Sequence, residues 1–404
     1  MRNVVYVAPF PMDATLRFSH GLAGLSDVRL LGVFQQPPQG DAARHFSDIA
    51  VVADALDPRS IVEGIERLVR RYGPPHRITG ILEPLQVPLA QVRQHFEVPG
   101  PSPQTAERFR DKALMKQVLQ KHNIPCARFR LLHGVQQGIE FADQIGLPLV
   151  LKPPAGAGCK ATWRIDDRAA LEQALNSLRP SAQNPILAEE FLRGREFSFE
   201  TVTLGGKIQA HSISQYLPTP LEVMQTPWIQ WVCLLPRDID TPQYKEIYAI
   251  GAKVVRALGL EDGVTHMEWF ARDDGSFAVG EIAARPPGGQ LTKMTGLVHD
   301  IDIYRTWARA VVDGRFDAKW QRKYAAATVF IRGVGRGRVA RVDGLDAAQA
   351  QIGHLVEEVK LPQVGMPKAD SYEGDGYVIL RHRDEDVVRR AVQCVLETVH
   401  VRYA

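Results

Sequence analysis

Apolar segments with strand-like and helix-like spacing alternate through the first hundred residues, and this alternation restricts the folds open to the chain. Val4–Ala8 and Val28–Phe34 are continuous apolar runs typical of buried strands, whereas Asp13–Leu25 between them has helical spacing. Further strands are expected at Ile49–Ala53 and Ile78–Leu82. Strands that alternate with helices predict a parallel sheet covered by helices, so we expect an α/β domain at the N-terminus.

The turn after the first of these strands argues against a dinucleotide site of the Rossmann kind. It holds no glycine before Gly21, whereas such a site needs a close approach of backbone to the pyrophosphate. The Pro/Gly-rich segment Val98–Pro103 predicts a domain boundary, followed by one helix from Pro103 to about His122. Farther on, Tyr216–Leu235 is expected to be a long irregular stretch.

The composition is that of an ordinary globular protein, with 45% hydrophobic and 24% charged residues among 404. The net charge of +3 does not predict the basic face of a nucleic-acid-binding protein. No apolar run reaches the roughly 18–20 residues that span a bilayer. Prolines interrupt the N-terminal apolar stretch, which favours a strand over a signal peptide. The four cysteines lie far apart, without metal-ligand spacing, so we expect a reducing, cytoplasmic location.

A lysine that precedes a glycine-containing loop is the first pattern that indicates chemistry. The apolar segment Leu149–Lys152 leads into a loop that contains Gly156 and Gly158, where unusual backbone angles are allowed. Backbone amides in such a loop can surround phosphate oxygens while the lysine supplies charge. Because the lysine comes before the glycines, this is not the P-loop pattern, and an ordinary loop is an equal alternative.

An acidic connector follows at Ala188–Ser198, where one strand is expected to end and another to begin. Exposed backbone in such a connector can bond the edge of an adenine, and Glu196 can accept the hydroxyl protons of a ribose. A linker with solvated acids is the alternative interpretation.

A pair of glutamates forms the third pattern, because Glu268 and Glu281 lie on the two strands of a predicted hairpin. Neighbouring carboxylates repel each other unless a cation lies between them, and Mg²⁺ prefers such oxygen ligands together with substrate phosphates. Arg285 follows at a distance suited to anion binding. Charged residues on the exposed face of a hairpin are the alternative.

The order of these patterns, together with Lys112 on the preceding helix, resembles the ATP-grasp superfamily over about residues 1–315. The Arg285–Gly289 run favours its carboxylate–amine ligase type, which includes L-amino-acid ligases. The resemblance implies an α/β (α+β) ATP-grasp fold with three domains. They are an N-terminal parallel-sheet domain (1–100), a two-lobed nucleotide clamp (101–315, with a small lobe at about 124–192 and a large lobe at about 193–315) and a C-terminal cap (316–404).

The resemblance also implies the roles of individual residues. Lys152 and Arg285 are the expected catalytic residues, and Glu268 and Glu281 are the expected ligands of Mg²⁺, with Mn²⁺ as an alternative metal. Glu189 is expected at the exocyclic amine of adenine and Glu196 at the ribose. The residues expected to bind ATP are Lys112, Lys152, Gly156, Gly158, Cys159, Glu189, Glu190, Leu192 and Glu196.

Two positions depart from the family pattern. Many members carry Asn two residues after the second glutamate, where this chain has Ala283, so the number of metal ions is open. Cys159 stands in the loop where Ser is frequent, and we interpret its thiol as a loop residue rather than a nucleophile. His266 is expected on the same strand face as Glu268, where it either hydrogen-bonds the metal carboxylate or a phosphate, or is merely packed.

The implied function is an ATP- and Mg²⁺-dependent ligase that forms an acyl phosphate and joins it to an amine. The alternatives are a thiol or carboxylation-type acceptor, or a pseudo-ligase that binds nucleotide without turnover. The expected partners are small carboxylates and amines, with a homodimer as an open alternative and no nucleic acid or membrane. The residues proposed to line the substrate site are His211, His266, Trp228, Trp231, Gly288 and Gly289.

Overall fold

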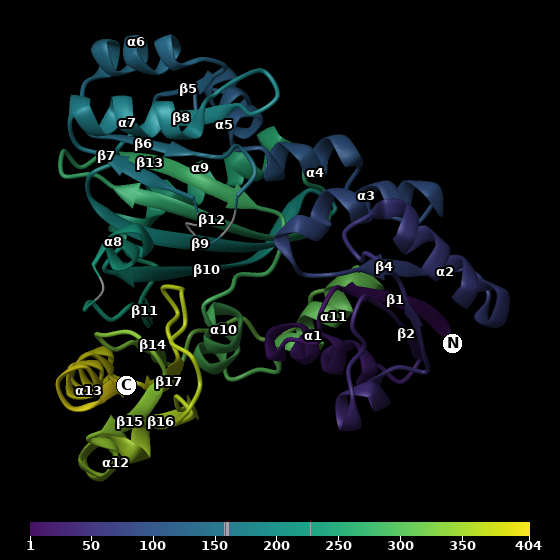
Figure 1. Ribbon diagram of the computed structural model, residues 1–404. Coiled ribbons are helices and arrows are strands. Elements are labelled where there is room, and N and C mark those ends of the chain that lie inside the picture. Colours follow the sequence, from purple (N-terminus) through teal and green to yellow (C-terminus); the bar gives the residue numbers. More distant parts are fainter. Residues whose placement is uncertain (157, 159–160, 227) are drawn as a thin grey trace.

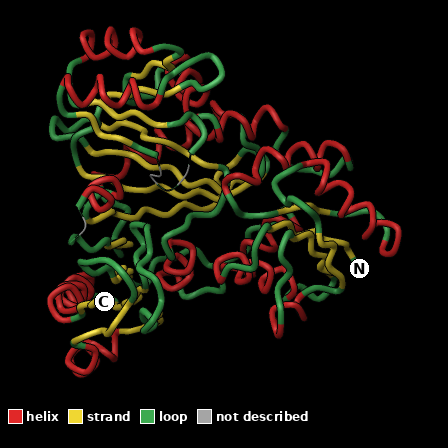
Figure 2. Tube along the Cα trace, viewed as in Figure 1, coloured by secondary structure: helices red, strands yellow, loops and turns green. Residues whose placement is uncertain are grey.

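The computed structural model describes residues 1–156, 158, 161–226 and 228–404. Figure 1 shows an N-terminal domain on the right, a small helix-covered sheet at the top and a long sheet that extends down to the C-terminal region. Figure 2 shows the same layers as strands flanked by helices. Among the helices of the described residues, none combines the length and the apolar character needed to cross a membrane.

The N-terminal domain is the predicted parallel sheet. Its strands, in the order β3-β2-β1-β4, are β1 (Arg2–Ala8), β2 (Val28–Phe34), β3 (Asp48–Val51) and β4 (Arg77–Thr79). Helices α2 (Pro58–Tyr72) and α3 (Gln86–His95) bury one apolar face of this sheet. The other face packs on α1 (Asp13–Ala23) and on α11 (Ile303–Asp313), a helix far along the chain.

The predicted single helix from Pro103 to His122 is wrong, because the chain forms two helices. They are α4 (Pro103–Arg110) and α5 (Lys112–Lys121). Asp111 between them has an extended backbone, and its carboxylate accepts a hydrogen bond from the amide of Leu114 at 2.9 Å. This new N-cap starts the second helix.

The small lobe is an antiparallel sheet covered by two helices. Its strands, in the order β5-β8-β6-β7, are β5 (Phe129–Leu132), β6 (Leu149–Lys152), β7 (Trp163–Ile165) and β8 (Ile186–Glu190). Helices α6 (Val135–Ile145) and α7 (Arg168–Leu178) cover it, and their apolar residues form one core with the strands. Figure 1 shows both helices on the outer side of this sheet.

The large sheet has eight antiparallel strands in the order β13-β12-β9-β10-β11-β14-β17-β16. The strands of its first half are β9 (Arg195–Leu204), β10 (Lys207–Leu217), β11 (Val232–Leu235), β12 (Gly263–Ala271) and β13 (Phe277–Ala283). Helix α9 (Pro242–Leu258) packs on the face of this half that carries Phe199 and Met267. The hairpin expected from the sequence, β12–β13, is confirmed by the strand pairing, and β9 and β10 form a second hairpin.

The second half of the large sheet comes from the C-terminal region. Its strands are β14 (Ala325–Ile331), β16 (Val356–Lys360) and β17 (Gly376–His382). Because β14 pairs with β11, the sheet runs without interruption across residue 315, where a boundary was expected. A separate two-stranded sheet consists of β15 (Val339–Asp343) and β18 (His400–Tyr403). The remaining helices are α8 (Pro220–Gln225), α10 (Leu291–His299), α12 (Leu345–Ile352) and α13 (Glu385–Thr398).

The stretch Tyr216–Leu235, expected to be irregular, is partly regular. It contains the helix α8 and the strand β11, which joins the two halves of the large sheet. The prediction failed because both elements are short and β11 is a fully buried strand without alternating polar residues.

Candidate functional site

Two glutamates face each other on neighbouring strands at one edge of the large sheet. Glu268 of β12 and Glu281 of β13 are direct partners in the register of the hairpin. The register shifts between Glu268 and Trp269, and the carbonyl of Gly280 in this β-bulge accepts a hydrogen bond from Lys116 Nζ at 2.9 Å. Side chains of directly opposed residues lie on the same face of a sheet, so the hairpin brings both carboxylates to one place.

Lysines from two other elements approach Glu281. The Glu281 carboxylate lies 3.3 Å from Nζ of Lys112, at the start of α5, and 3.9 Å from Nζ of Lys152, at the end of β6. Burial raises the pKa of Glu281, but attraction to these two lysines outweighs it and holds the pKa at about 2. Because β6 belongs to the small sheet and β13 to the large one, Lys152 joins the two lobes here.

Glu189 of β8 is a buried acid next to the same lysines. Its Oε2 lies 3.0 Å from Lys152 Nζ and its Oε1 lies 3.4 Å from Lys116 Nζ. Burial raises the pKa of Glu189, but attraction to both lysines brings it below its ordinary value. The side chain that the resemblance assigned to adenine thus lies between two ammonium groups, where it orients them.

The connector expected to hold adenine begins where β8 ends. The Glu190 carboxylate accepts hydrogen bonds from Arg128 Nε at 2.6 Å and from Arg272 Nη2 at 3.0 Å. Burial raises the pKa of Glu190, and these arginines bring it below its ordinary value. Leu192 follows in a half-buried loop between β8 and β9. The side chain of Glu190 therefore fixes the connector rather than facing the acid pair.

Glu196, near the start of β9, is buried in the same electrostatic environment as the acid pair. Burial raises its pKa well above the ordinary value, and repulsion from Glu268 and Glu281 raises it further, against attraction to Lys152. Three carboxylates from three adjacent strands therefore repel one another. A cation between them would relieve this repulsion.

The glycine-containing loop after β6 is anchored where it begins. The carbonyl of Gly156 accepts hydrogen bonds from Lys112 Nζ and from Arg110 Nη1, each at 3.0 Å. Gly158 has φ +68°, in the left-handed region that favours glycine. The ATP-binding candidate Cys159 lies outside the described residues.

Arg285 follows β13 and is oriented by the N-terminal domain. Its Nε donates a hydrogen bond to Glu83 Oε2 at 2.6 Å, and its Nη1 donates to the carbonyl of Pro286 at 3.0 Å. Burial lowers the pKa of Arg285, but attraction to Glu83 outweighs it and raises the pKa. No sequence pattern pointed to Glu83, because it lies in a short 3₁₀ turn, Glu83–Leu85, in another domain.

His266 links two carboxylates on the face of the large sheet that carries the acid pair. Its Nδ1 lies 2.9 Å from Glu200 Oε1, and its Nε2 lies 3.6 Å from Glu268 Oε1. The Tyr216 hydroxyl donates to the same Glu268 oxygen at 3.4 Å. Burial lowers the pKa of His266, but the two carboxylates outweigh it and raise the pKa to about 9. His266 therefore lies within ion-pair distance of Glu268 rather than being merely packed beside it.

The tryptophans expected near an acceptor pocket take different positions. Trp231 is buried and stacks on Phe330, with ring centroids 4.9 Å apart. A Cβ atom placed on Gly289, which has φ +57°, would lie 3.2 Å from the Trp231 ring, so the Gly288–Gly289 segment packs directly on this indole. Trp228 is 70% exposed, which does not support a role in a substrate pocket.

His211 is not brought to the acid pair. It pairs with Thr201 on the sheet face opposite to Glu268, because side chains alternate along β10. Its ring packs against Tyr248, with centroids 4.4 Å apart, and against Phe199. A substrate contact of His211 stays a prediction, and the sequence pattern did not reveal which face of the sheet His211 occupies.

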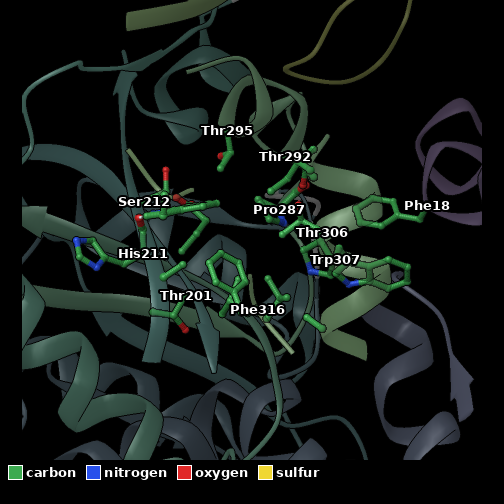
Figure 3. A pocket seen from close by; sticks show the side chains of 18 residues that line it. Phe18, Thr201, His211, Ser212, Pro287, Thr292, Thr295, Thr306, Trp307 and Phe316 are labelled. Atoms are coloured by element: carbon green, nitrogen blue, oxygen red, sulfur yellow. Dashed lines mark hydrogen bonds between the residues drawn. The ribbon is translucent and has the colours of Figure 1, made fainter. Parts of the chain in front are cut away.

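A small cavity of about 50 Å³ lies between the large sheet, α10 and α11. Figure 3 shows Phe18 of α1, Trp307 of α11 and Phe316 around it, with the His211 ring turned away. Pro287, two residues after Arg285, lies on its wall. The cavity therefore adjoins the arginine loop and is lined mainly by carbon.

Several residues of this arrangement were missed by sequence reasoning. Glu200 could have been found, because Glu196, Ser198 and Glu200 alternate along one face of β9. Tyr372 and Glu373 gave no signal, since they lie in an irregular loop of the C-terminal region. Tyr372 nevertheless packs on Trp231, with ring centroids 4.6 Å apart.

Comparisons with known proteins show what the chain is similar to. The family model of the ATP-grasp domain matches residues 117–295. The L-arginine-specific L-amino acid ligase of Bacillus subtilis is 26% identical over 268 residues, which are 65% of this chain and 64% of that protein. The alanine–anticapsin ligase of Bacillus subtilis strain 168 is 24% identical over 60% of this chain and 55% of that protein. The match to the first of these relatives thus spans slightly less than two thirds of its length.

Solved structures share the fold over nearly the whole chain. The L-amino acid ligase from Bacillus licheniformis superposes with a TM-score of 0.83 at 19% identity, covering 100% of this chain and 99% of that one. N5-carboxyaminoimidazole ribonucleotide synthetase from Thermotoga maritima has a TM-score of 0.74 at 19% identity, covering 100% of both chains. The chain therefore contains a match to the ATP-grasp domain over residues 117–295, and it is similar to ATP-grasp ligases of the carboxylate–amine type.

Proposed function

We propose that the chain is an ATP- and Mg²⁺-dependent ligase that joins a carboxylate to an amine. In the first step a carboxylate oxygen attacks the γ-phosphorus of ATP, ADP leaves and an acyl phosphate forms. In the second step the amine nitrogen attacks the acyl carbon, phosphate leaves and the nitrogen loses a proton. The products are an amide, ADP and phosphate. The observation that carries the proposal is the convergence of Glu268 and Glu281 with Lys112, Lys152 and Arg285.

The chemistry of the donor set fits a magnesium ion. Among the described residues, no group of three or more His, Cys, Asp or Glu side chains is arranged to hold a metal without other ligands. Glu268 and Glu281 supply two carboxylates on one face of the sheet, and phosphate oxygens would complete the coordination. Bound there, magnesium would neutralise charge on the transferred phosphoryl group. Manganese, with the same preference for oxygen ligands, remains an alternative proposal.

The cationic side chains have separate tasks in this proposal. Lys112 and Lys152 bind phosphate oxygens, because both ammonium groups lie beside Glu281 and beside the anchored glycine loop. Arg285, held by Glu83, stabilises charge on the phosphoryl or acyl phosphate group. Glu196 accepts hydroxyl protons of the ribose, and the connector near Leu192 offers its backbone to adenine.

An amine acceptor is favoured by the functions for which the relatives are named. One Bacillus subtilis protein is named an L-amino acid ligase and the other an alanine–anticapsin ligase, and both align with more than half of this chain. We propose a small amine, giving an amide or dipeptide. We further propose a cytoplasmic enzyme. A homodimer is supported only by the dimer named for one neighbour of similar fold, a biotin carboxylase domain.

The test is release of ADP over a matrix of amino acids, each pair incubated with ATP and Mg²⁺. We expect ADP and an amide in equal amounts for at least one pair. ADP release with thiols in place of amines would indicate the thiol alternative, and ADP release with bicarbonate would indicate the carboxylation alternative. ATP binding without ADP release for every pair would contradict the proposal and support the pseudo-ligase.

A further inference from the structure

A loop of the C-terminal region is fixed against the end of β14. The amide of Asp375 donates to the carbonyl of Ile331 at 3.0 Å, and the Asp375 carboxylate accepts from the amide of Ala369 at 2.7 Å. Gly374 has φ +64°, and a Cβ atom there would lie 2.5 Å from the Ile331 carbonyl oxygen. The loop therefore has a defined shape that holds the residues at its tip, Tyr372 and Glu373, in place.

The tip of this loop reaches the phosphate side of the site. The Tyr372 ring meets the Trp231 ring edge to face, and it lies 3.9 Å from the Cβ position of Gly158 in the glycine loop. Tyr372 is also close enough to Arg285 to affect its pKa. The C-terminal region thus supplies a wall of the site beside the glycine loop and Arg285.

Glu373 lies next to the segment that follows Arg285. Its Oε1 is 3.9 Å from the Cβ position of Gly288, and the backbone amide of Gly289 stabilises its charged form. Burial nevertheless raises the pKa of Glu373 above its ordinary value. Lys360 attracts the Glu373 carboxylate only from a distance, because within the described ranges no lysine, arginine or histidine nitrogen lies within 4.0 Å of it. A half-buried carboxylate without a close cation favours a ligand that brings one.

Opposite charges are therefore placed along a short stretch of the site. The Arg285 guanidinium is held by Glu83, and the Glu373 carboxylate lies beside Gly288 and Gly289, a few residues after Arg285 in the chain. A free amino acid carries a carboxylate and an ammonium group a few ångströms apart. We propose that Glu373 binds the ammonium group of an amino-acid substrate and so selects amino acids over plain carboxylic acids. This inference rests on the proposed ligase function.

Two sources of the ammonium group share this chemistry. It belongs either to the amino acid whose carboxylate is phosphorylated or to the amino acid that acts as acceptor. Two assays distinguish these sources, each with one substrate held constant. Hydroxylamine is the common acceptor when the donor amino acid is varied, and one donor at saturating concentration is used when the acceptor is varied. Hydroxylamine converts the acyl phosphate to a hydroxamate, with release of phosphate.

The experiment compares wild type, Glu373→Gln and the matched control Asp370→Asn, an exposed acid in the same loop. The measured quantities are KM and kcat for ADP release with an amino acid and with its analogue lacking the amino group. In the wild type we expect a KM for the amino acid at least about tenfold below that of the analogue. Glu373→Gln should raise the KM for the amino acid about 10- to 100-fold and leave the KM values for the analogue and for ATP within about twofold of the wild type. Asp370→Asn should change none of these three KM values.

The two assays show which substrate carries the ammonium group, and they test the inference. A raised KM in the hydroxylamine assay assigns the ammonium to the donor, and a raised KM only for the varied acceptor assigns it to the acceptor. Equal wild-type KM values for each amino acid and its analogue would overturn the inference even if Glu373→Gln failed to fold. Unchanged KM values in a folded Glu373→Gln would overturn it too. Absence of ADP release by the wild type with every substrate would instead refute the proposed ligase function.

Discussion

Lys152 contacts acids of both lobes, Glu189 in the small sheet and Glu281 in the large sheet. Glu189 lies between Lys152 and Lys116, so a buried carboxylate fixes both ammonium groups before any nucleotide arrives. Pre-positioned charges cost little reorganisation when a phosphate binds. At the scale of single residues, the site is therefore a set of lysines held in place by an acid that the nucleotide does not need to touch.

Lys152→Ala should weaken ATP binding about 10- to 100-fold, because a charge-assisted contact to phosphate is lost. Titration calorimetry with ATP measures the effect. Lys245→Ala, which removes an exposed lysine from α9, is the matched control and should leave the affinity unchanged. An ATP affinity of Lys152→Ala equal to that of the wild type would count against the assignment.

At the scale of elements, the break between α4 and α5 positions Lys112 at the first turn of a helix. Asp111 caps α5 by accepting a hydrogen bond from the amide of Leu114, and the amide of Lys112 donates to the carbonyl of Pro154 at 2.9 Å. The helix start is thus tied to the loop after β6. A continuous helix would not allow this arrangement.

Asp111→Ala should lower the free energy of unfolding by about 1 kcal/mol through the lost cap and also weaken ATP binding, because Lys112 loses its anchor. Ser102→Ala removes the cap of α4, where the Ser102 hydroxyl accepts from the amide of Thr105 at 3.1 Å. It should cost a similar amount of stability without an effect on ATP. Urea unfolding and calorimetry give the two quantities; equal ATP affinities for both variants would contradict the prediction.

A buried histidine at the end of α10 makes the free energy of unfolding depend on pH. His299 is 1% exposed, stacks on Trp320 and has Nδ1 2.9 Å from the carbonyl of Thr295. Burial lowers its pKa from 6.5 to about 4. As the pH falls, the imidazole of His299 is therefore protonated in the unfolded chain before it is protonated in the folded one. The contribution of neutral His299 to the free energy of unfolding is fully present above about pH 6.5 and is lost progressively toward pH 4, by up to about 3 kcal/mol.

The measurement is the free energy of unfolding between pH 7.5 and pH 4.5 for wild type and His299→Gln, since the variant removes this one titration. We expect the wild type to lose more stability than the variant across this interval. Parallel curves would show that His299 does not carry the predicted dependence.

Local periodicity was sufficient to predict the elements that bear the acid pair. The alternation in β12 and the turn residues at 273–275 predict the hairpin, and the hairpin alone sets Glu268 opposite Glu281. Helix α3 escaped prediction because Pro88 lies inside it, and β11 because a short buried strand has no periodic signal. The face occupied by His211 depends on register across β9 and β10, which no local pattern supplies.

At the scale of the whole molecule, three regions far apart in sequence complete the site. Glu83 from the N-terminal domain orients Arg285, and Tyr372 and Glu373 come from the C-terminal region. The large sheet carries these contacts, because β11 and β14 pair across the expected domain boundary. Such contacts were outside the reach of sequence reasoning, since each depends on how separate sheets pack. The order of the lysines and glutamates along the chain was informative because it is independent of packing.

Glu83→Gln should lower kcat for ADP release about 10- to 100-fold while the affinity for ATP stays within about twofold. The reason is that Arg285 loses its charged partner and with it the orientation required at the transferred group. Steady-state kinetics and calorimetry separate the two effects. Glu66→Gln, an exposed acid on α2, is the control, and a kcat of Glu83→Gln equal to that of the control would refute the coupling.

The convergence of two carboxylates and several cations on one magnesium-bound triphosphate is tested most directly by Glu281→Gln. ADP release is measured as magnesium is titrated, with circular dichroism to check that the variant is folded. We predict that folded Glu281→Gln loses at least about a thousandfold in ADP release at every magnesium concentration, because a ligand and a charge are removed together. Unchanged ADP release by a folded Glu281→Gln would contradict the account.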